Sequence, residues 1–461
     1  MKSVYCVAFS LFAASLFAVT PFDKMALKGR TDKANPVGYA AGEPIVFTIR
    51  TEGIESVPTD DTYRIKWTRT GDDGKRAEGY CPFVIGETCV VTTKMDRAGF
   101  VRLEAFLVAG ADNRRVKRDC IAPGSPAWAG DREVFFDGGA GVDVEKIAQF
   151  KPEPADFDAF WAKQKELAKS VPVKAVCKAV KTVNGCRILA VSVDCFGPRP
   201  VTGYLFIPEN AAPKSCGARV GFQGYGFYKQ GCPEWASWNC VAQKEIFLEI
   251  NAHGYELDRE NEYYKEFEKG IRTPQYGYAF SPEENAKPET AYFCAMAHRV
   301  MRALEYVKTL PEWNGKDLVA EGGSQGGLQT SWAAGLDPDV TLARPSITWC
   351  CDIGATEPGG RLHGDWFIKW APGLDYFDSV NHIKRAKCPV EITRAGLGDY
   401  TCPPSGLAAY YNAIPGKKSV NWVQGSRHGF VPQGANQTIV LGDFDPTGGE
   451  SRSQSASKDV E

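Results

Sequence analysis

The chain has 461 residues, a length that suggests two or three domains of ordinary size. Hydrophobic residues make up 43% and charged residues 24%, which is typical of a globular protein and excludes collagen, coiled coil and a wholly disordered chain. The 54 basic and 56 acidic residues give a net charge of −2 without a basic stripe, so nucleic acid is not an expected partner.

The first segment predicts an exported protein. After Lys2 an uncharged, mostly apolar run covers residues 4–19, which is shorter than the about 20 residues that span a membrane. A short apolar run behind one positive charge, with small residues near Ala18, is typical of a cleaved signal peptide, here residues 1–19. An uncleaved anchor stays the alternative, because the small-residue pattern before the cleavage site is imperfect. We expect a secreted or periplasmic protein without membrane contact after cleavage.

The cysteines favour neither a metal site nor a redox motif. No pair among the 15 cysteines has CxxC spacing, and five histidines are too few for a metal cage, so we expect no metal and no cofactor. Export permits disulfides, and two pairs are close enough in sequence to form one, Cys81 with Cys89 and Cys232 with Cys240. The alternative is that most cysteines are small buried hydrophobic residues.

The first third of the chain predicts a small all-β domain. Short segments that alternate apolar and polar residues are separated by turn residues, and they occupy residues 44–50, 63–68, 89–93 and 100–106. Repeated short strands predict an immunoglobulin-like β-sandwich, which we place with its linker at residues 20–141. The glycine-rich run 138–141 is interpreted as that linker.

From residue 142 to 443 the pattern becomes mixed. Asp156 is placed to cap a helix with apolar residues on one face, and a second helix fits residues 290–310. Apolar strands alternate with helices downstream, at residues 202–207, 219–222, 246–250, 318–320 and 390–393. This order predicts an α/β domain with a mostly parallel sheet and helices on both faces. Residues 444–461 are polar, and we expect a disordered tail there.

The central motif is Gly-Gly-Ser-Gln-Gly-Gly at residues 322–327. A GxSxG pattern alone is weak, but the buried strand 318–320 leads into it and a helix-like segment follows. Strand, sharp turn and helix are what the nucleophile elbow of an α/β-hydrolase requires. We predict that Ser324 is the nucleophile of such a fold; the alternative is a glycine-rich turn with an incidental serine.

A serine needs an imidazole to take its proton, and in α/β-hydrolases the acid and then the histidine follow the serine in the chain. Asp399 lies in a loop after the strand 390–395, and His428 is the histidine that remains after it, following the strand 420–423. Both loops are then at the same sheet edge as the serine, as a triad requires.

Other residues could fill these roles. Asp352 ends the strand after the nucleophile helix and is the alternative acid. His298 is expected in the middle of a helix, and His253 precedes the serine, which breaks the chain order. For the oxyanion hole, which needs two backbone N–H donors, we assign Gln325 and Tyr225, the latter in the glycine-containing segment 222–226.

Several of these segments together resemble the acetyl xylan esterase/cephalosporin-C deacetylase family. They are residues 154–161, 203–208, 223–226, 322–327, 399–405 and 428–430, in the family's order. The resemblance implies Ser324 as nucleophile, Asp399 as acid, His428 as base, and the amides of Tyr225 and Gln325 as oxyanion hole. The chain departs from the family in its N-terminal β-domain, in Gln223-Gly224 where the family has His-Gly, and in the lack of a closing helix. The family's ring-shaped homo-oligomer therefore does not carry over directly.

The expected function is a secreted serine esterase that removes acetyl groups from acetylated carbohydrates such as xylan. The preference for acetyl over longer acyl groups is implied by the family resemblance alone. Two alternatives stay open. One is a serine peptidase of the prolyl-oligopeptidase kind, although about 100 residues cannot form its β-propeller. The other is a noncatalytic carbohydrate-binding protein on a hydrolase fold. Trp366, Trp370 and Tyr400 are candidate sugar platforms. We also expect a chain starting near Val142 to keep its activity on small esters.

Overall fold

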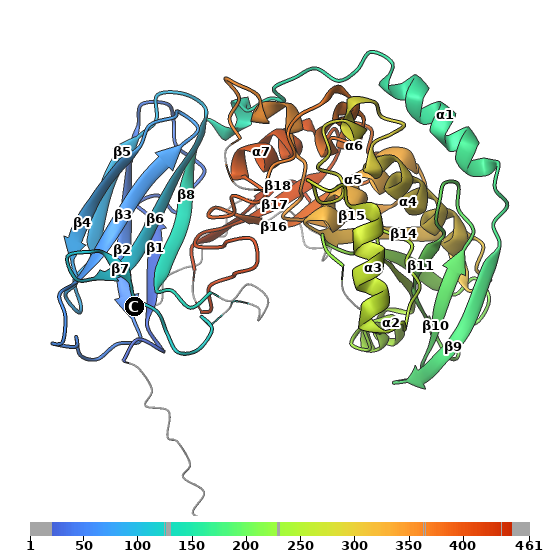
Figure 1. The fold of residues 1–461 in the computed structure, drawn as a ribbon, viewed down its shortest axis with the longest axis horizontal. Coiled ribbons are helices and arrows are strands. Elements are labelled where there is room, and N and C mark those ends of the chain that lie inside the picture. The colour runs from blue at the N-terminus through green and yellow to red at the C-terminus, as the bar shows by residue number, and fades with distance from the viewer. Residues whose placement is uncertain are drawn as a thin grey trace, which may run out of the picture.

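The computed structural model describes residues 21–444 except 124, 126–130, 228–230, 363, 365 and 435. The expected signal peptide and nearly all of the expected tail therefore lie outside the described residues. Figure 1 shows two parts side by side: an N-terminal β region, residues 21–142, and a C-terminal α/β region, residues 143–444. Along the described residues, every helix is too short or too polar to cross a membrane.

The described strands of the N-terminal β region form two antiparallel sheets. One has the order β1-β2-β5, and the other has the order β4-β3-β6-β7, with β8 also paired to β6. Their bounds are β1 Ala26–Thr31, β2 Pro44–Glu52, β3 Tyr63–Gly71, β4 Ala77–Pro82, β5 Cys89–Lys94, β6 Gly99–Ala109, β7 Arg114–Arg115 and β8 Phe135–Val142. Phe47 of β2 and Leu103 of β6 are fully buried in one shared core. Both sheets therefore enclose the same apolar interior, while an immunoglobulin-like topology stays a prediction.

The interpretation of residues 138–141 as a linker is wrong. They lie inside β8, whose residues are all buried and pair antiparallel with β6. The glycines serve close packing here, because a side chain on Gly139 would come within 3.0 Å of the Leu397 carbonyl oxygen in the C-terminal α/β region. The sequence run looked flexible because glycine is common in loops, but the absence of a side chain also lets two backbones approach.

In the described part of the C-terminal α/β region, ten strands form one sheet in the order β18-β17-β16-β15-β14-β12-β13-β11-β10-β9. In this sheet order the neighbouring strands β13, β12, β14, β15, β16 and β17 run parallel to one another. Antiparallel strands flank them at both ends. The bounds are β9 Ala175–Val183, β10 Cys186–Val193, β11 Val201–Pro208, β12 Cys216–Phe222, β13 Glu245–Ile250, β14 Trp313–Gly323, β15 Leu342–Ser346, β16 Val390–Gly396, β17 Lys418–Val423 and β18 Thr438–Gly442. The predicted mixed α/β fold with a large sheet is confirmed.

The helices of this region are α1 Phe157–Lys169, α2 Ala236–Gln243, α3 Asn261–Ile271, α4 Tyr292–Lys308, α5 Gln325–Leu336, α6 Ser379–Ile383 and α7 Pro404–Ala413. Of these, α2, α4, α5 and α7 contact strands of the sheet. Helix α4 matches the helix expected over residues 290–310. The side chain of Asp156 does not cap α1 as expected; it accepts a hydrogen bond from the Tyr376 hydroxyl instead. Among the described residues β18 is the last element and pairs with β17, so an edge strand follows the last loop of the sheet where the family resemblance implies a helix.

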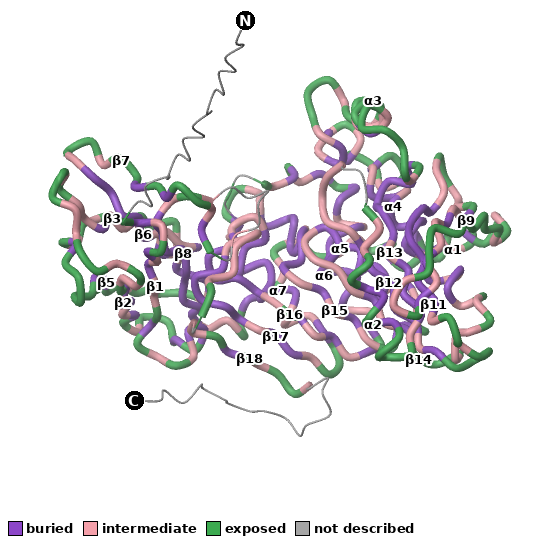
Figure 2. Tube along the Cα trace, turned by 90° about the horizontal axis from the view of Figure 1, so that it is seen from below, coloured by how far each residue is buried: buried purple, intermediate pink, exposed green. Residues whose placement is uncertain are grey.

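The two parts share a buried interface. Phe100 of β6 lies 5.4 Å from Trp422 of β17 between ring centroids, and both belong to the core of the C-terminal α/β region. Figure 2 shows buried backbone on both sides of this contact, in β8 and in β16 and β17. Because apolar side chains of both parts enter one core, the expectation that the parts are separate modules is not supported by the packing.

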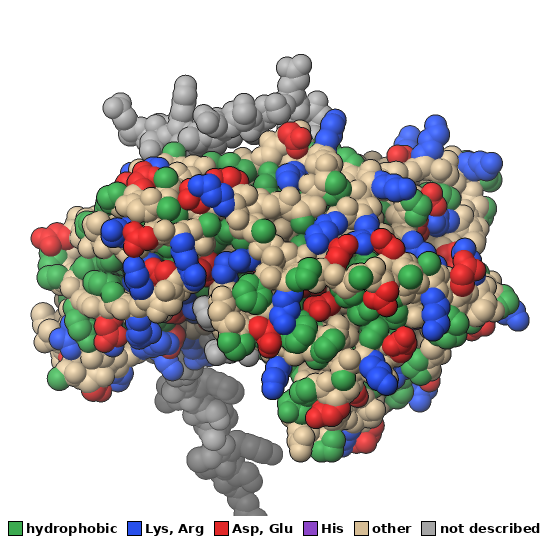
Figure 3. Space-filling view, turned by 90° about the horizontal axis from the view of Figure 1, so that it is seen from above, with side chains coloured by type: hydrophobic (Ala, Val, Ile, Leu, Met, Phe, Trp, Pro, Cys, Tyr) green, Lys and Arg blue, Asp and Glu red, His purple; other side chains and the backbone are tan. Residues whose placement is uncertain are grey.

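On the face seen in Figure 3, Lys and Arg side chains mingle with Asp and Glu, in keeping with the balanced composition. Cys81 and Cys89 form the disulfide that the sequence allowed, whereas Cys232 and Cys240 are free thiols.

Candidate active site

Ser324 stands on a sharp turn between β14 and α5. Its φ of 59° and ψ of −119° are unusual for a residue with a side chain, as expected of a nucleophile elbow. The turn needs glycine at Gly326, because a side chain there would overlap the Phe222 carbonyl of the neighbouring strand β12. The Ser324 amide donates to the Ser346 carbonyl at 2.9 Å, which anchors the turn to β15. The local backbone thus lifts the serine hydroxyl above the sheet edge.

Two further loops of the sheet meet at this serine. We call residues 396–402 the acid loop and residues 424–430 the histidine loop. Asp399 Oδ2 lies 2.9 Å from His428 Nδ1, and His428 Nε2 lies 3.0 Å from Ser324 Oγ. The Asp399 side chain is fully buried, whereas the imidazole is 23% exposed, so the pair is covered on one side and open to a ligand on the other. The three residues that the sequence assigned to a triad form one hydrogen-bonded chain.

Backbone groups fix the carboxylate and join the two loops. Asp399 Oδ1 accepts hydrogen bonds from the amides of Thr401 and Cys402, at 3.0 and 2.9 Å. The Gly398 amide donates to the Ser426 carbonyl at 3.0 Å, so the acid loop and the histidine loop are bonded to each other. With its second oxygen held this way, the carboxylate presents one fixed oxygen to the imidazole.

The segment after β12, which carries Tyr225, lies against the elbow. The side-chain amide of Gln325 donates to the Gly224 carbonyl at 3.3 Å, and Gln329 on α5 donates to the Gln223 carbonyl at 3.0 Å. These contacts bring the two proposed oxyanion donors, the amides of Tyr225 and Gln325, to the same end of the sheet. Tyr225 lies in the loop after β12, and Gln325 is the first residue of α5.

Tyr278 links the loop that carries Tyr225 to the start of α5, and the sequence analysis missed this residue. Its hydroxyl donates to Gln325 Oε1 at 2.8 Å and accepts from the Gly226 amide at 3.2 Å. Its ring stacks on Tyr225 with 4.2 Å between centroids. Burial raises the pKa of Tyr278 well above its ordinary value, so the hydroxyl stays protonated. Tyr278 lies in irregular backbone without a motif, so no sequence signal could have found it.

The rival residues occupy other environments. Asp352 is buried and paired with Arg361 at 2.7 Å, and burial raises the pKa of its carboxyl. His298 bonds through Nε2 to Gln164 at 3.0 Å inside the core. His253 is also buried, which lowers the pKa of its imidazole well below the ordinary value. The contacts of all three thus lie away from the Ser324 hydroxyl.

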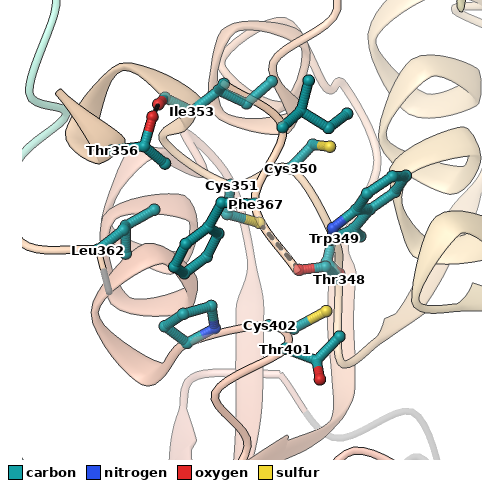
Figure 4. Close-up of a pocket in the computed structure, with 12 residues that line it drawn as sticks. Thr348, Trp349, Cys350, Cys351, Ile353, Thr356, Leu362, Phe367, Thr401 and Cys402 are labelled. Atoms are coloured by element: carbon teal, nitrogen blue, oxygen red, sulfur yellow. Dashed lines mark hydrogen bonds between the residues drawn. The ribbon is translucent and has the colours of Figure 1, made fainter. Parts of the chain in front are cut away.

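A pocket adjoins the triad, lined largely by apolar side chains (Figure 4). Trp349 and Leu362 form opposite walls, and Cys402 lies between them near the floor of the view. The Cys402 thiol interacts with the Ser324 hydroxyl, and the Trp349 amide donates to the Ser324 carbonyl at 3.1 Å, so two of the lining residues contact the serine. A pocket in this place can receive the acyl group of an ester.

Of the three candidate sugar platforms, one is free at the site. Trp366 is 45% exposed, and its ring lies 5.1 Å from that of Tyr225. Trp370 is covered by the Lys151 ammonium at 3.3 Å from the ring centroid. The Tyr400 ring is covered by the Arg102 guanidinium at 4.3 Å. Trp366 therefore remains the candidate that a flat ligand could reach.

One cluster at the site has the residue types of a metal site, but its bonding fits a metal ion poorly. Asp399, Cys402 and His428 offer potential ligand atoms within 4.8 Å of one another. Burial raises the pKa of the Cys402 thiol well above its ordinary value, so this side chain is a neutral thiol beside the serine. The other two side chains are already bonded to each other. The arrangement fits proton transfer to and from a serine hydroxyl.

Comparison with known proteins gives the family of the chain. The model of the acetyl xylan esterase family matches residues 142–355 and 370–441, which is more than half of the chain. The chain belongs to the acetyl xylan esterase family. The resemblance noted in the sequence is thereby confirmed for the family, a family of carboxylic ester hydrolases.

Individual relatives match about three fifths of the chain. The chain is 27% identical to acetyl esterase Axe7A of Xylanibacter ruminicola over 300 residues, 60% of this chain and 64% of that protein. It thus spans less than two thirds of the length of this relative. The acetyl xylan esterase from Paenibacillus sp. R4 superposes with a TM-score of 0.52 at 25% identity, covering 62% of this chain and 93% of the other. Acetyl xylan esterase 1 from Thermoanaerobacterium sp. JW/SL YS485 gives 0.52 at 20% identity, with 62% and 92% covered, and shares the fold.

Proposed function

We propose that this protein is a serine esterase that removes acetyl groups from acetylated carbohydrates, with acetylated xylan and xylo-oligosaccharides as the favoured substrates. The observation that carries the proposal is the unbroken chain of contacts from Asp399 through His428 to Ser324, at 2.9 and 3.0 Å. Family membership supports the ester class, and the names of the similar proteins support the acetyl group and the xylan.

The reaction runs in two halves. His428 Nε2 takes the Ser324 proton as Oγ attacks the acetyl carbonyl carbon, and the negative oxygen is stabilised by the amides of Tyr225 and Gln325. The imidazolium then gives its proton to the sugar oxygen, which leaves as an alcohol, and acetyl-Ser324 remains. Water then attacks this ester as His428 takes its proton, and the imidazolium returns that proton to Ser324 Oγ as acetic acid leaves and ionises to acetate. Throughout, Asp399 stays ionised and holds the Nδ1 proton of His428.

The acyl preference follows from the pocket beside the serine. Its walls include Trp349, Leu362 and Phe367, and Cys402 stands next to the nucleophile. We propose that an acetyl methyl fits there and that a butyryl chain fits poorly. Trp366 is proposed as the surface on which the sugar ring stacks.

Export is part of the same proposal. Residues 1–19 are proposed as a signal peptide, with a secreted or periplasmic mature protein, and the Cys81–Cys89 disulfide supports an oxidising compartment. Assembly into a homo-oligomer stays a prediction, to be measured on the purified protein.

One assay series tests the function. Wild type should release acetate from acetylated xylo-oligosaccharides and cleave 4-nitrophenyl acetate faster than the butyrate. Ser324→Ala should keep the same melting temperature and lose about 10⁴- to 10⁶-fold in turnover, because only binding and the oxyanion hole remain. Cleavage of a prolyl peptide amide in place of the acetates would favour a peptidase, and no hydrolysis by wild type would favour a binding protein.

A further inference from the structure

The N-terminal β region reaches the catalytic loops through one strand, β8. Asp137 in this strand is fully buried, and it accepts hydrogen bonds from Arg102 at 2.9 and 2.7 Å. It also accepts one from Arg427 Nε at 2.8 Å. Arg427 precedes His428 in the histidine loop, so the carboxylate of one region pairs with the neighbour of the catalytic imidazole in the other.

A second contact ties the start of the same loop to β8. Gln424 is 1% exposed, and its side-chain Oε1 accepts from the Gly139 amide at 2.8 Å. Its Nε2 donates to the Gly139 carbonyl at 2.9 Å. One amide side chain thus pairs with both backbone groups of a residue in β8, as a neighbouring strand would. The histidine loop is held on both sides of Gly425 and Ser426.

The end of the loop packs on the same strand. Phe430 lies 5.1 Å from Phe135 between ring centroids, and the Arg427 guanidinium lies 3.8 Å above the Phe135 ring. The acid loop is close as well, because a side chain on Gly398 would overlap the Asp137 carbonyl. Both loops that carry the charged members of the triad therefore lie directly on β8.

We propose that the N-terminal β region completes the active site, with Asp137 and Gln424 as positioning residues that orient the His428 imidazole. The inference rests on the proposed function, and it names what holds the base of that reaction. The buried charge pair fixes Arg427, and the amide pairing fixes Gln424 three residues before it. Because His428 directly follows Arg427, its imidazole has little freedom. Ser324 and the oxyanion amides are held without these contacts.

The test compares Gln424→Ala with a matched control, Asn412→Ala. Asn412 on α7 also makes two side-chain bonds to backbone carbonyls at the junction of the regions, to Val144 at 2.8 Å and Ile147 at 2.9 Å. Both variants lose two side-chain bonds to the backbone, one with an amide and one with a carbonyl for Gln424 and two with carbonyls for Asn412, but Asn412 lies outside the histidine loop. A general stabilising role predicts similar effects of both changes, and positioning predicts an effect of Gln424→Ala alone.

The substrates separate orientation from stability. A 4-nitrophenolate leaves without a proton, whereas a sugar alkoxide needs the proton of His428. We therefore expect Gln424→Ala to lower kcat/KM for per-acetylated xylose by about 10- to 100-fold, and for 4-nitrophenyl acetate by about tenfold less. Asp137→Asn, which leaves two guanidinium groups without their shared carboxylate, should show the same preference. Asn412→Ala should change both values less than about twofold.

Equal losses on the two esters, or turnover of Gln424→Ala within about twofold of wild type, would overturn the inference. A second measurement does not depend on turnover. The His428 Nδ1 proton bonded to Asp399 should give a downfield proton resonance in wild type and Asn412→Ala, and exchange with water should broaden it in Gln424→Ala. An unchanged resonance also counts against positioning. If wild type hydrolyses neither ester, the proposed function fails while this resonance still decides the positioning role.

Discussion

The two halves of the active site are stabilised from different parts of the chain. The nucleophile and the oxyanion segments are bonded to each other within the C-terminal α/β region, through Gln325 and Tyr278. The acid and histidine loops lie on β8 of the N-terminal β region, through Asp137 and Gln424. We infer from this difference that the proton-transfer groups of an active site can depend on contacts with a second part of the chain that is distant in sequence. The nucleophile and the oxyanion donors of the same site do not depend on those contacts.

Removal of the N-terminal β region should have the largest effect. A chain starting at Val142 lacks both sheets and exposes apolar side chains such as Trp422 and Phe430, which now contact that region. We expect it to be poorly soluble and without measurable turnover of 4-nitrophenyl acetate, in contrast to our interpretation of the sequence. A chain starting at Pro21 is the control and should be active. Soluble protein with activity within about tenfold of the control would show that the halves are independent.

The charged half can be tested at its acid. Asp399→Asn should keep the fold and lower turnover about 10⁴-fold, because an amide cannot hold the Nδ1 proton of His428 in the required tautomer. Asp352→Asn is the matched control, since this carboxyl is also buried but paired with Arg361. It should lower the melting temperature and leave kcat within about threefold. If the two changes exchange their effects on kcat, Asp352 is the acid.

The elbow can be broken from its backbone. Gly326→Ala places a methyl group against the Phe222 carbonyl of β12, which cannot move without disturbing the sheet. We expect a loss of about 3 kcal/mol in the free energy of unfolding, the upper end for an overpacked core. Turnover should fall more than stability alone explains, because Ser324 shifts with the turn. Gly416→Ala, where a methyl group meets open space, is the control. If Gly326→Ala unfolds in denaturant as wild type does and keeps wild-type turnover, that result would contradict the strained geometry.

The sequence predicted most of the large elements for a clear reason. Alternation and apolar runs depend on local burial, so strands such as β2, β12 and β16 and the helix α4 could be found. The serine motif and the strands before each loop led to Ser324, Asp399 and His428, because parallel strands end at one sheet edge. Chain order alone also allowed Asp352, which the structure pairs with Arg361 while Asp399 bonds His428.

What the sequence did not predict depends on contacts between distant segments. The glycines of β8 are a loop signal until the neighbouring backbone of the acid loop is known, and then they are a packing requirement. Asp137 is one acidic residue among many until Arg102 and Arg427 surround it. A signal was present in the apolar run before the glycines, from Val134 to Phe136, which is typical of a buried strand.

The smallest expected effect concerns the uncharged half. Tyr278→Phe removes the hydroxyl that bonds Gln325 and the Gly226 amide, but the ring can still stack on Tyr225. Each of the two lost bonds contributes about 1 kcal/mol, so turnover should fall at most about thirtyfold and by the same factor for per-acetylated xylose and 4-nitrophenyl acetate. The equality is expected because the oxyanion amides act on the carbonyl oxygen that both esters share, whereas proton transfer depends on the leaving group. Gln424→Ala should discriminate between the esters and Tyr278→Phe should not. If Tyr278→Phe instead penalises the sugar ester more strongly, the oxyanion segments and His428 are coupled, and the two halves of the site are not held separately.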